Sequence, residues 1–152
     1  MSNEIDIGRG KRGRRAYSFD DVAVVPSRRT RDPEEVSVGW QIDAYHFDTP
    51  IVAAPMDSVV SPATAVAIGR LGGLGVLDLE GLWTRYEDPE PLLAEIATLE
   101  PGASTRRMQE LYAAPIIPEL ITQRLQEIRR AGVTVAGALS PQRTQQHWKT
   151  VV

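Results

Sequence analysis

The sequence predicts an α/β fold built around a parallel sheet. Three continuous apolar runs, at residues 51–54, 74–77 and 133–139, have the length and composition of buried strands. Each run is followed along the chain by a helix-period stretch that begins at a Ser-Pro or Asp-Pro step, and the first two of these stretches end at glycine. Strands that alternate with helices pair in parallel through right-handed crossovers, and helices that cover such a sheet require apolar strands.

The composition fits one globular domain with a single core. The chain has 152 residues, of which 42% are hydrophobic and 24% charged. It contains no apolar run of the ~20 residues that a membrane-spanning helix needs and no secretory signal, so we expect a cytoplasmic protein with no membrane contact. It has no cysteine, which excludes thiolate chemistry within these residues. His46 and His147 are its only histidines, and no cluster has metal-ligand spacing, so no metal site is predicted.

Basic residues concentrate at the N-terminus. Residues 1–31 hold eight Lys and Arg against four acids, whereas the rest of the chain holds nine against sixteen. We interpret residues 1–16 as a solvated basic arm that precedes a second region, residues 17–152. Nucleic-acid binding by the arm is the alternative, but no aromatic residues interleave the charges, so nucleic acid is not an expected partner.

An extended segment precedes the first predicted strand of the sheet. Residues 17–27 and 36–47 are typical of an N-terminal arm or small hairpin packed beside that strand. Hydrophobic alternation with a period of two at Val36, Val38, Trp40 and Ile42 predicts that the second stretch contains a strand.

The first strand–helix unit runs from Ile51 to Gly73. Its helix starts at Ser61-Pro62 and ends at Leu71, and Gly72-Gly73 is interpreted as the helix C-cap. A phosphate-binding glycine loop is rejected here, because such a loop lies between a strand and the start of a helix, and in this segment the order is reversed.

The second unit begins with the strand at residues 74–77 and continues through a long connection. A helix starting at Asp88-Pro89 is predicted to end before Gly102 and to face the core with one apolar stripe, formed by Leu92, Leu93, Ile96 and Leu99. Residues 103–117 are predicted to be irregular, with a short helix near Thr105–Tyr112. A clearer helix at residues 118–131 turns Leu120, Ile121, Leu125 and Ile128 inward, and the third unit follows with its helix from Ser140-Pro141.

Polar residues follow the predicted strands at the point where each strand ends. Met56, Asp57 and Ser58 follow the first strand, Asp78 and Glu80 the second, and Ser140 the third. Ligands of parallel sheets bind at the carboxyl ends of the strands, so these positions are candidate binding residues. The alternatives are turn formation or helix capping for Asp57 and Ser58, core packing for Met56, and solvated loop acids for Asp78 and Glu80.

Two stretches resemble a known family. YSFDDVAVVPSRRT at residues 17–30 and PIVAAPMDSVVSPATAVAIGRLGGLGVL at residues 50–77 are similar, in order and spacing, to the N-terminal portion of the IMP dehydrogenase/GMP reductase family. The likeness is closest to the IMP-dehydrogenase-related branch that lacks the CBS module, because residues 100–132 are too few to hold that module.

The resemblance implies a TIM (β/α)8 barrel, of which this chain carries the first three βα units, so the barrel is incomplete and the chain is expected to be a fragment. It implies an NAD- or NADP-linked oxidoreductase of purine and guanine nucleotide biosynthesis that acts at purine C2 of IMP, XMP or GMP. It also implies a homotetramer and, in some full-length members, a monovalent cation. By this resemblance Met56 packs against the purine base, with Ala54, Asp57, Ser58 and Asp78 around the same site.

Two departures from the family pattern concern the purine pocket. Ala54 stands where many dehydrogenases have Ser, and Asp78 and Leu79 stand where they often have His. These changes favour GMP reduction, or binding without turnover, over IMP oxidation. The family also attacks purine C2 with a cysteine thiolate, and this chain has none, so residues 1–152 alone are predicted to be inactive and to contain no catalytic residue. A non-catalytic nucleotide-binding or regulatory paralogue is the alternative.

Overall fold

The computed structural model describes residues 4–25 and 31–151, and the chain divides into two compact units, Met1–Val36 and Ser37–Val152. Residues 26–30, the end of the first family-like stretch, lie outside the described part. In the first unit, β1 (Glu4–Gly8) and β2 (Lys11–Arg14) form an antiparallel hairpin. Two short 3-10 helices follow, η1 (Phe19–Asp21) and η2 (Pro33–Glu35).

The β1–β2 hairpin was not predicted, because the basic residues hide its alternation. Gly10 supplies the positive φ of +70° that the tight turn needs. Arg12 on β2 lies 3.4 Å from the Glu4 carboxylate and 3.6 Å from Asp6, so part of the basic charge in the arm is paired across the two strands.

The second unit begins with another antiparallel hairpin, β3 (Trp40–Ile42) and β4 (Tyr45–Phe47). The rings of Trp40 and Phe47 stack with centroids 4.7 Å apart, and the Trp40 indole donates a hydrogen bond of 2.9 Å to the Thr49 carbonyl. The predicted hairpin is thus confirmed only within residues 36–47, because the described part of residues 17–27 contains η1 and no strand. The strand is shorter than predicted, since Val36 and Val38 precede it and are exposed.

Three parallel strands form the central sheet: β5 (Val52–Ala53), β6 (Leu74–Asp78) and β7 (Ala136–Ala138), with β6 in the middle. The register pairs Val52 with Leu74 and Leu77 with Gly137. All three strands therefore end at one edge, and the predicted parallel pairing is confirmed, although β5 and β7 are shorter than their apolar runs.

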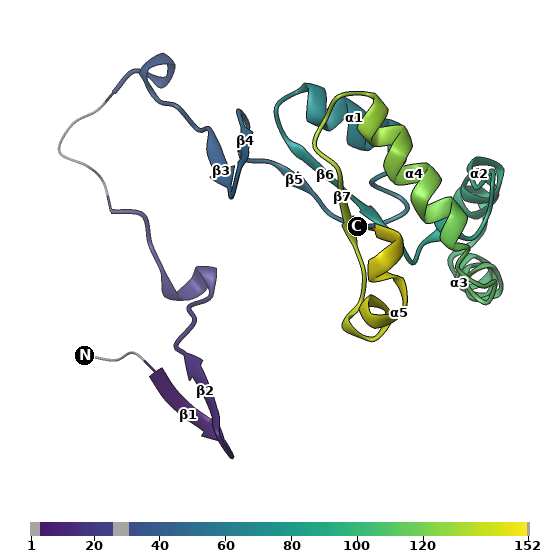
Figure 1. The fold of residues 1–152 in the computed structure, drawn as a ribbon, viewed down its shortest axis with the longest axis horizontal. Coiled ribbons are helices and arrows are strands. Elements are labelled where there is room, and N and C mark those ends of the chain that lie inside the picture. Colours follow the sequence, from purple (N-terminus) through teal and green to yellow (C-terminus); the bar gives the residue numbers. More distant parts are fainter. Residues whose placement is uncertain (1–3, 26–30, 152) are drawn as a thin grey trace. The chain divides into compact units, whose positions relative to one another are not determined.

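Two helices, α1 (Pro62–Arg70) and α4 (Pro118–Arg130), pack against each other on one face of this sheet (Figure 1). Ser61 caps α1 by accepting the Thr64 N–H at 3.0 Å, and Gly72 leaves the helix with φ +81°, so the predicted caps are confirmed. The final helix, α5 (Pro141–Val151), packs against α4.

The core lies between the sheet and these helices. It contains Leu77 and Leu79 from β6 and its end, Ala65 from α1, and the predicted inward residues Ile121, Leu125 and Ile128 of α4. Trp83 joins it from η3 (Leu82–Thr84), where the buried Arg124 lies over its ring and donates to its carbonyl at 3.2 Å. The opposite face of the sheet carries Val52, which is 52% exposed.

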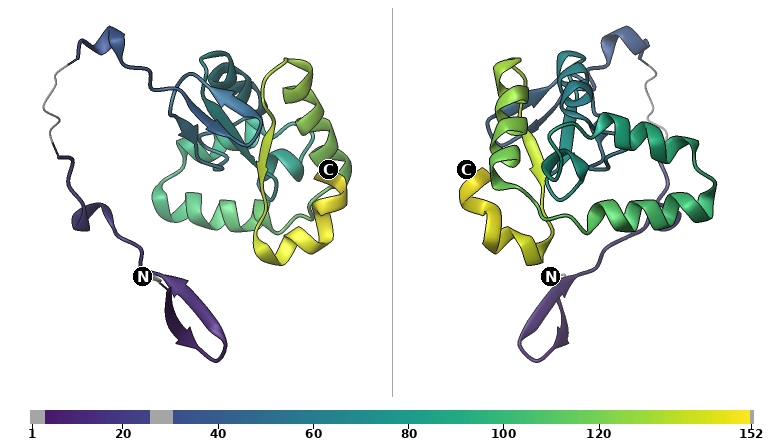
Figure 2. Two further views of the ribbon diagram at one scale, coloured as in Figure 1. Left: turned by 60° about the vertical axis from the view of Figure 1, so that its left-hand side comes forward. Right: turned by 90° about the vertical axis from the view of Figure 1, so that its right-hand side faces the viewer.

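The connection between β6 and β7 differs most from prediction. After α2 (Glu90–Thr98), residues that were predicted to be irregular form a full helix, α3 (Pro101–Tyr112), and Gly102 lies in its first turn instead of ending α2. The two helices form an antiparallel hairpin that projects from the sheet (Figure 2). None of the predicted core-facing residues of α2 is fully buried.

Gly75 allows α1 to lie close to β6, and replacing it is expected to separate them. A Cβ at this position would lie 2.6 Å from the Ala65 Cα. We expect Gly75→Val to destabilise the fold by about 3 kcal/mol, the upper end for overpacking, as a lower urea midpoint. Gly102→Ala is the control, because nothing lies within 4 Å of its added Cβ. Equal midpoints for Gly75→Val and the wild type would contradict this packing.

Candidate functional site

A cavity of about 580 Å³ opens at the carboxyl ends of β5 and β6. Met56, Asp57, Ser58 and Asp78, four of the five predicted binding residues, lie in its lining. The fifth, Ala54, precedes the lining segment, which starts at Pro55. The structure therefore brings together predicted residues from the ends of two neighbouring strands, β5 and β6.

Besides Leu82 of η3, the rest of the lining comes from the helical hairpin, which was not predicted to belong to the site. From α2 come Leu93, Ile96 and Ala97, and from α3 come Met108 and Tyr112. These spacings of three and four residues place the side chains on one face of each helix. Of the four residues in the stripe predicted to face the core, Leu93 and Ile96 line this cavity at the sheet edge, and the other two do not.

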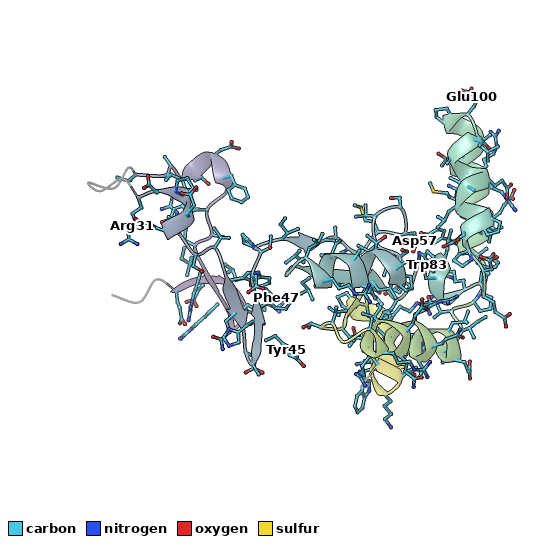
Figure 3. The ribbon with its side chains drawn as sticks, turned by 90° about the horizontal axis from the view of Figure 1, so that it is seen from above. Arg31, Tyr45, Phe47, Asp57, Trp83 and Glu100 are labelled. Carbon is cyan, nitrogen blue, oxygen red and sulfur yellow. The ribbon has the colours of Figure 1, made fainter. Side chains whose placement is uncertain are left out.

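The Asp57 carboxylate connects three elements at the bottom of the cavity. Its Oδ2 accepts the Leu82 backbone N–H at 2.7 Å and the Tyr112 hydroxyl at 2.5 Å. Its Oδ1 is buried without a hydrogen-bond partner. Figure 3 shows Asp57 near the base of the α2–α3 hairpin, far from Glu100 at the tip. Part of the role of Asp57 is therefore structural.

The lack of a side chain at Gly81 leaves room for the Asp57 carboxylate. A Cβ on Gly81 would lie only 2.0 Å from the Asp57 Oδ1, and Gly81 itself is buried. Any side chain at position 81 would displace the carboxylate from the Leu82 N–H. Gly81 was not identified from the sequence, where it has no neighbouring glycine or turn signal.

Two titratable groups in the cavity have altered proton affinity. Burial raises the pKa of Asp78 above its ordinary value, and the nearby charges of Asp57 and Glu80 add to this, while a hydrogen bond of 2.9 Å from the Glu80 N–H opposes it. Burial, followed by the Asp57 carboxylate, also raises the pKa of the Tyr112 hydroxyl. Tyr112 is therefore a neutral hydrogen-bond donor, and Asp57 and Asp78 are the charged residues of the lining.

Glu80 connects the end of β6 to the end of β7. Its carboxylate accepts a hydrogen bond from the Ser140 N–H. Burial alone would raise the pKa of Glu80, but its hydrogen bonds with Ser140 and the charges of Arg143 and Arg85 lower it. The ionised Glu80 side chain thus connects the ends of β6 and β7 and is not a freely solvated loop acid.

A second cavity, of about 280 Å³, lies on the other side of Tyr112. Its lining includes Arg85, Arg143 and Gln146, and also His147, which is 3% exposed and whose Nε2 is buried without a partner. Arg85 donates to the Glu80 carbonyl at 2.9 Å and to the Ala114 carbonyl, and its guanidinium lies over the Tyr112 ring. This cavity is basic, whereas the first is acidic.

Neither a metal cluster nor a membrane-spanning helix occurs in the described ranges. Residues 4–25 and 31–151 contain no group of three or more His, Cys, Asp or Glu placed to hold a metal ion. No helix in the same part of the chain has both the length and the apolar character to cross a membrane.

A solved structure shares this arrangement of strands and helices, and curated relatives are similar in sequence. An IMP dehydrogenase/GMP reductase-like protein from Corynebacterium glutamicum superimposes with a TM-score of 0.82 at 40% sequence identity, over 98% of this chain and 41% of that one. Uncharacterized oxidoreductases of Mycolicibacterium smegmatis and Mycobacterium tuberculosis are 46% and 47% identical over 97% of this chain. The chain spans 41% and 40% of the lengths of these two relatives.

The fold and the strand-end cavity thus define an α/β protein whose parallel sheet places a cavity at the ends of its strands. Residues 16–135 match the family model described as the IMP dehydrogenase / GMP reductase domain, and the chain belongs to that family. The inosine-5'-monophosphate dehydrogenase of Methanocaldococcus jannaschii is 41% identical over 42% of this chain and 13% of its own length. The family resemblance of the N-terminal stretches is therefore confirmed.

The half-buried carboxylate of Asp78 is expected to reduce stability at neutral pH. Because its pKa is raised in the folded state, folding favours the protonated form and disfavours the charged one. We expect Asp78→Asn, whose side-chain oxygen can still accept the Glu80 N–H, to raise the free energy of unfolding at pH 7 by about 0.5–1 kcal/mol.

The gain should disappear on acidification, as the pH falls through the raised pKa of Asp78 toward the ordinary aspartate value of 3.8 and the wild-type side chain becomes neutral. Urea unfolding at several pH values measures this. Asp88→Asn is the matched control, since Asp88 accepts a backbone N–H two residues on in the same way but is exposed. A gain from Asp78→Asn that does not change with pH would contradict the assignment.

Proposed function

We propose that this chain forms part of a purine-nucleotide oxidoreductase of the IMP dehydrogenase/GMP reductase type, and that it contributes the base-binding side of the nucleotide site. The observation that carries the proposal is the cavity at the ends of β5 and β6, lined by Met56, Asp57 and Asp78, in a chain of this family. Ligands of such barrels bind at this edge of the sheet.

The lining of the cavity suits a purine base. Met56 is half exposed at its rim, and a thioether is polarizable and adapts to a heteroaromatic face. The carboxylate oxygens of Asp57 and Asp78 can accept hydrogen bonds, which suits the N–H groups at the edge of a purine. The volume of about 580 Å³ lies within the range of roughly 300–1,000 Å³ common for small-molecule sites.

The residues of the second cavity fit an NAD or NADP cofactor. Arg85 and Arg143 supply positive charge for its phosphates, and the buried, unpartnered Nε2 of His147 has an unmet hydrogen bond there. Bound NAD(P) supplies the acceptor or donor of a hydride. In the proposal these three residues bind its phosphates and orient it toward the base cavity on the other side of Tyr112.

The covalent step of the family is not assigned to any residue of this chain. That step needs a cysteine thiolate, and the 152 residues include none. The roles proposed here are binding and orientation of the substrate. Purine nucleotides (IMP, XMP or GMP), the homotetramer and the direction of reaction remain proposals that follow from family membership.

A non-catalytic nucleotide-binding paralogue is the second candidate. Ala54 and Asp78 favour it, because they replace polar groups that many dehydrogenases place at the nucleotide. Calorimetric titration with IMP, XMP and GMP, followed by NAD(P)H absorbance assays in both directions, separates the two candidates in protein expressed from its complete reading frame. Binding with turnover supports the oxidoreductase, and binding without any absorbance change supports the paralogue.

Met56→Asp is expected to weaken nucleotide binding without unfolding the protein. Met56 is 50% exposed, so a carboxylate there stays solvated in the free protein. It would add a third negative charge to a cavity that already holds Asp57 and Asp78, and we expect affinity to fall at least about tenfold, which corresponds to about 1.4 kcal/mol. Titration calorimetry measures the affinity and thermal melting checks the fold, with Met56→Leu as the control. Unchanged affinity would remove Met56 from the site.

A further inference from the structure

The α2–α3 hairpin presents an apolar face to the base cavity, and of this face Leu93 also packs against the protein core. Leu93, Ile96 and Ala97 of α2 and Met108 of α3 line the cavity together with Met56. Met108 is 40% exposed although it lies on the inner face of the hairpin. The hairpin thus forms an apolar wall, with flexible side chains, along a cavity that protein atoms do not fill.

Hydrogen bonds between charged side chains connect the two helices of the hairpin. Arg107 of α3 makes two hydrogen bonds to the Glu95 carboxylate of α2, of 2.8 and 3.2 Å, and a third of 3.1 Å to Glu110. A bidentate pair of this kind fixes the two helices relative to each other.

The base of the hairpin is attached to the sheet edge near the cavity. Leu111 is buried, and its carbonyl accepts the Tyr86 hydroxyl at 3.0 Å. On the cavity side the attachment is the hydrogen bond of 2.5 Å from Tyr112 to Asp57. This bond joins the hairpin directly to the segment that carries Met56.

We propose that the α2–α3 hairpin is the second wall of the nucleotide site, that Met108 contacts the purine ring together with Met56, and that Tyr112 is a positioning residue that sets the wall through Asp57. This proposal rests on the proposed function and extends it to residues that sequence reasoning did not place in the site.

Charge decides which part of a nucleotide this wall contacts. The charged groups of the lining are Asp57 and Asp78, and none of the lining residues is Lys, Arg or His. A phosphate would be repelled there, whereas a neutral purine ring gains contact with two thioethers and with Ile96 and Leu93. The ring is therefore the occupant that the wall fits.

The test measures the affinity of IMP, XMP and GMP by titration calorimetry in protein expressed from its complete reading frame. For a nucleotide that the wild type binds, we expect Met108→Ala to weaken binding about 2- to 10-fold, the range of sulfur–aromatic contacts. Met108→Leu, which keeps an apolar side chain of similar size, should restore affinity to within about 2-fold.

Tyr112→Phe tests positioning, because it removes only the hydroxyl that Asp57 accepts. We expect affinity to fall about 3- to 10-fold, as for a lost hydrogen bond to a charged group that acts indirectly. If Tyr112 acts through the wall, Tyr112→Phe should weaken nucleotide affinity by less than about 2-fold when Met108→Ala is already present. A merely structural role would not produce this non-additivity.

Two controls isolate the wall. Leu99→Ala changes the same half-buried stripe at a position outside the cavity lining, and Tyr45→Phe removes an exposed hydroxyl on β4, so both should bind as the wild type does. Wild-type affinity in Met108→Ala, or purely additive effects of the two substitutions, would overturn this inference alone. Failure of the wild type to bind any of the three nucleotides would instead overturn the proposed function.

Discussion

The carboxylate of Asp57, held in place by the backbone at Gly81, is the contact on which the architecture of the site depends. Asp57 leaves β5, Leu82 opens η3 after β6, and Tyr112 ends α3, and one carboxylate accepts hydrogen bonds from the last two. Only glycine at position 81 leaves room for it. The strand-end loop, the loop after β6 and the helical hairpin are therefore joined at a single side chain.

This contact succeeds because the core beneath it is well packed. Leu77 and Leu79 at the end of β6 are fully buried against α1 and α4, and Trp83 is held by the stacked Arg124. The core fixes where β6 ends, and with it where Asp78 and Gly81 lie. The half-buried, partly unpaired carboxylates of the cavity destabilise the fold, and the core offsets this loss, as is common for binding sites.

The parts of the fold that could be predicted are those whose signal is local. The caps at Ser61 and Gly72 and the 3.6-residue period of Leu120, Ile121, Leu125 and Ile128 each arise within one turn or one helix, and strand-end reasoning brought Met56 and Asp78 together. The α3 helix was predicted too short, near Thr105–Tyr112 only, because its 12 residues include few apolar ones and begin with Pro and Gly.

The missed site residues have a different explanation. Tyr112 and Asp57 are 55 residues apart, and nothing in either local sequence pairs them. The stripe on α2 has the period of a core-facing helix, but period reports only that a face is apolar, not whether protein or ligand covers it. That distinction needs the position of the hairpin, which projects from the sheet edge and does not pack across the sheet.

Tyr112 also separates two cavities of opposite charge, and this separation gives the site its polarity. Tyr112 lines the first cavity together with Asp57 and Asp78. It also lines the second cavity together with Arg85, Arg143 and His147, and the Cζ of Arg85 lies 5.5 Å from the centroid of its ring. In the proposed function, a neutral heterocycle would bind beside the acidic residues and an anionic phosphate beside the basic ones. Because Tyr112 stays protonated and donates to Asp57, no negative charge arises at the boundary itself. In the proposed nucleotide oxidoreductase, the same tyrosine that holds the hairpin against the base would then keep the phosphates of a second nucleotide out of the base cavity.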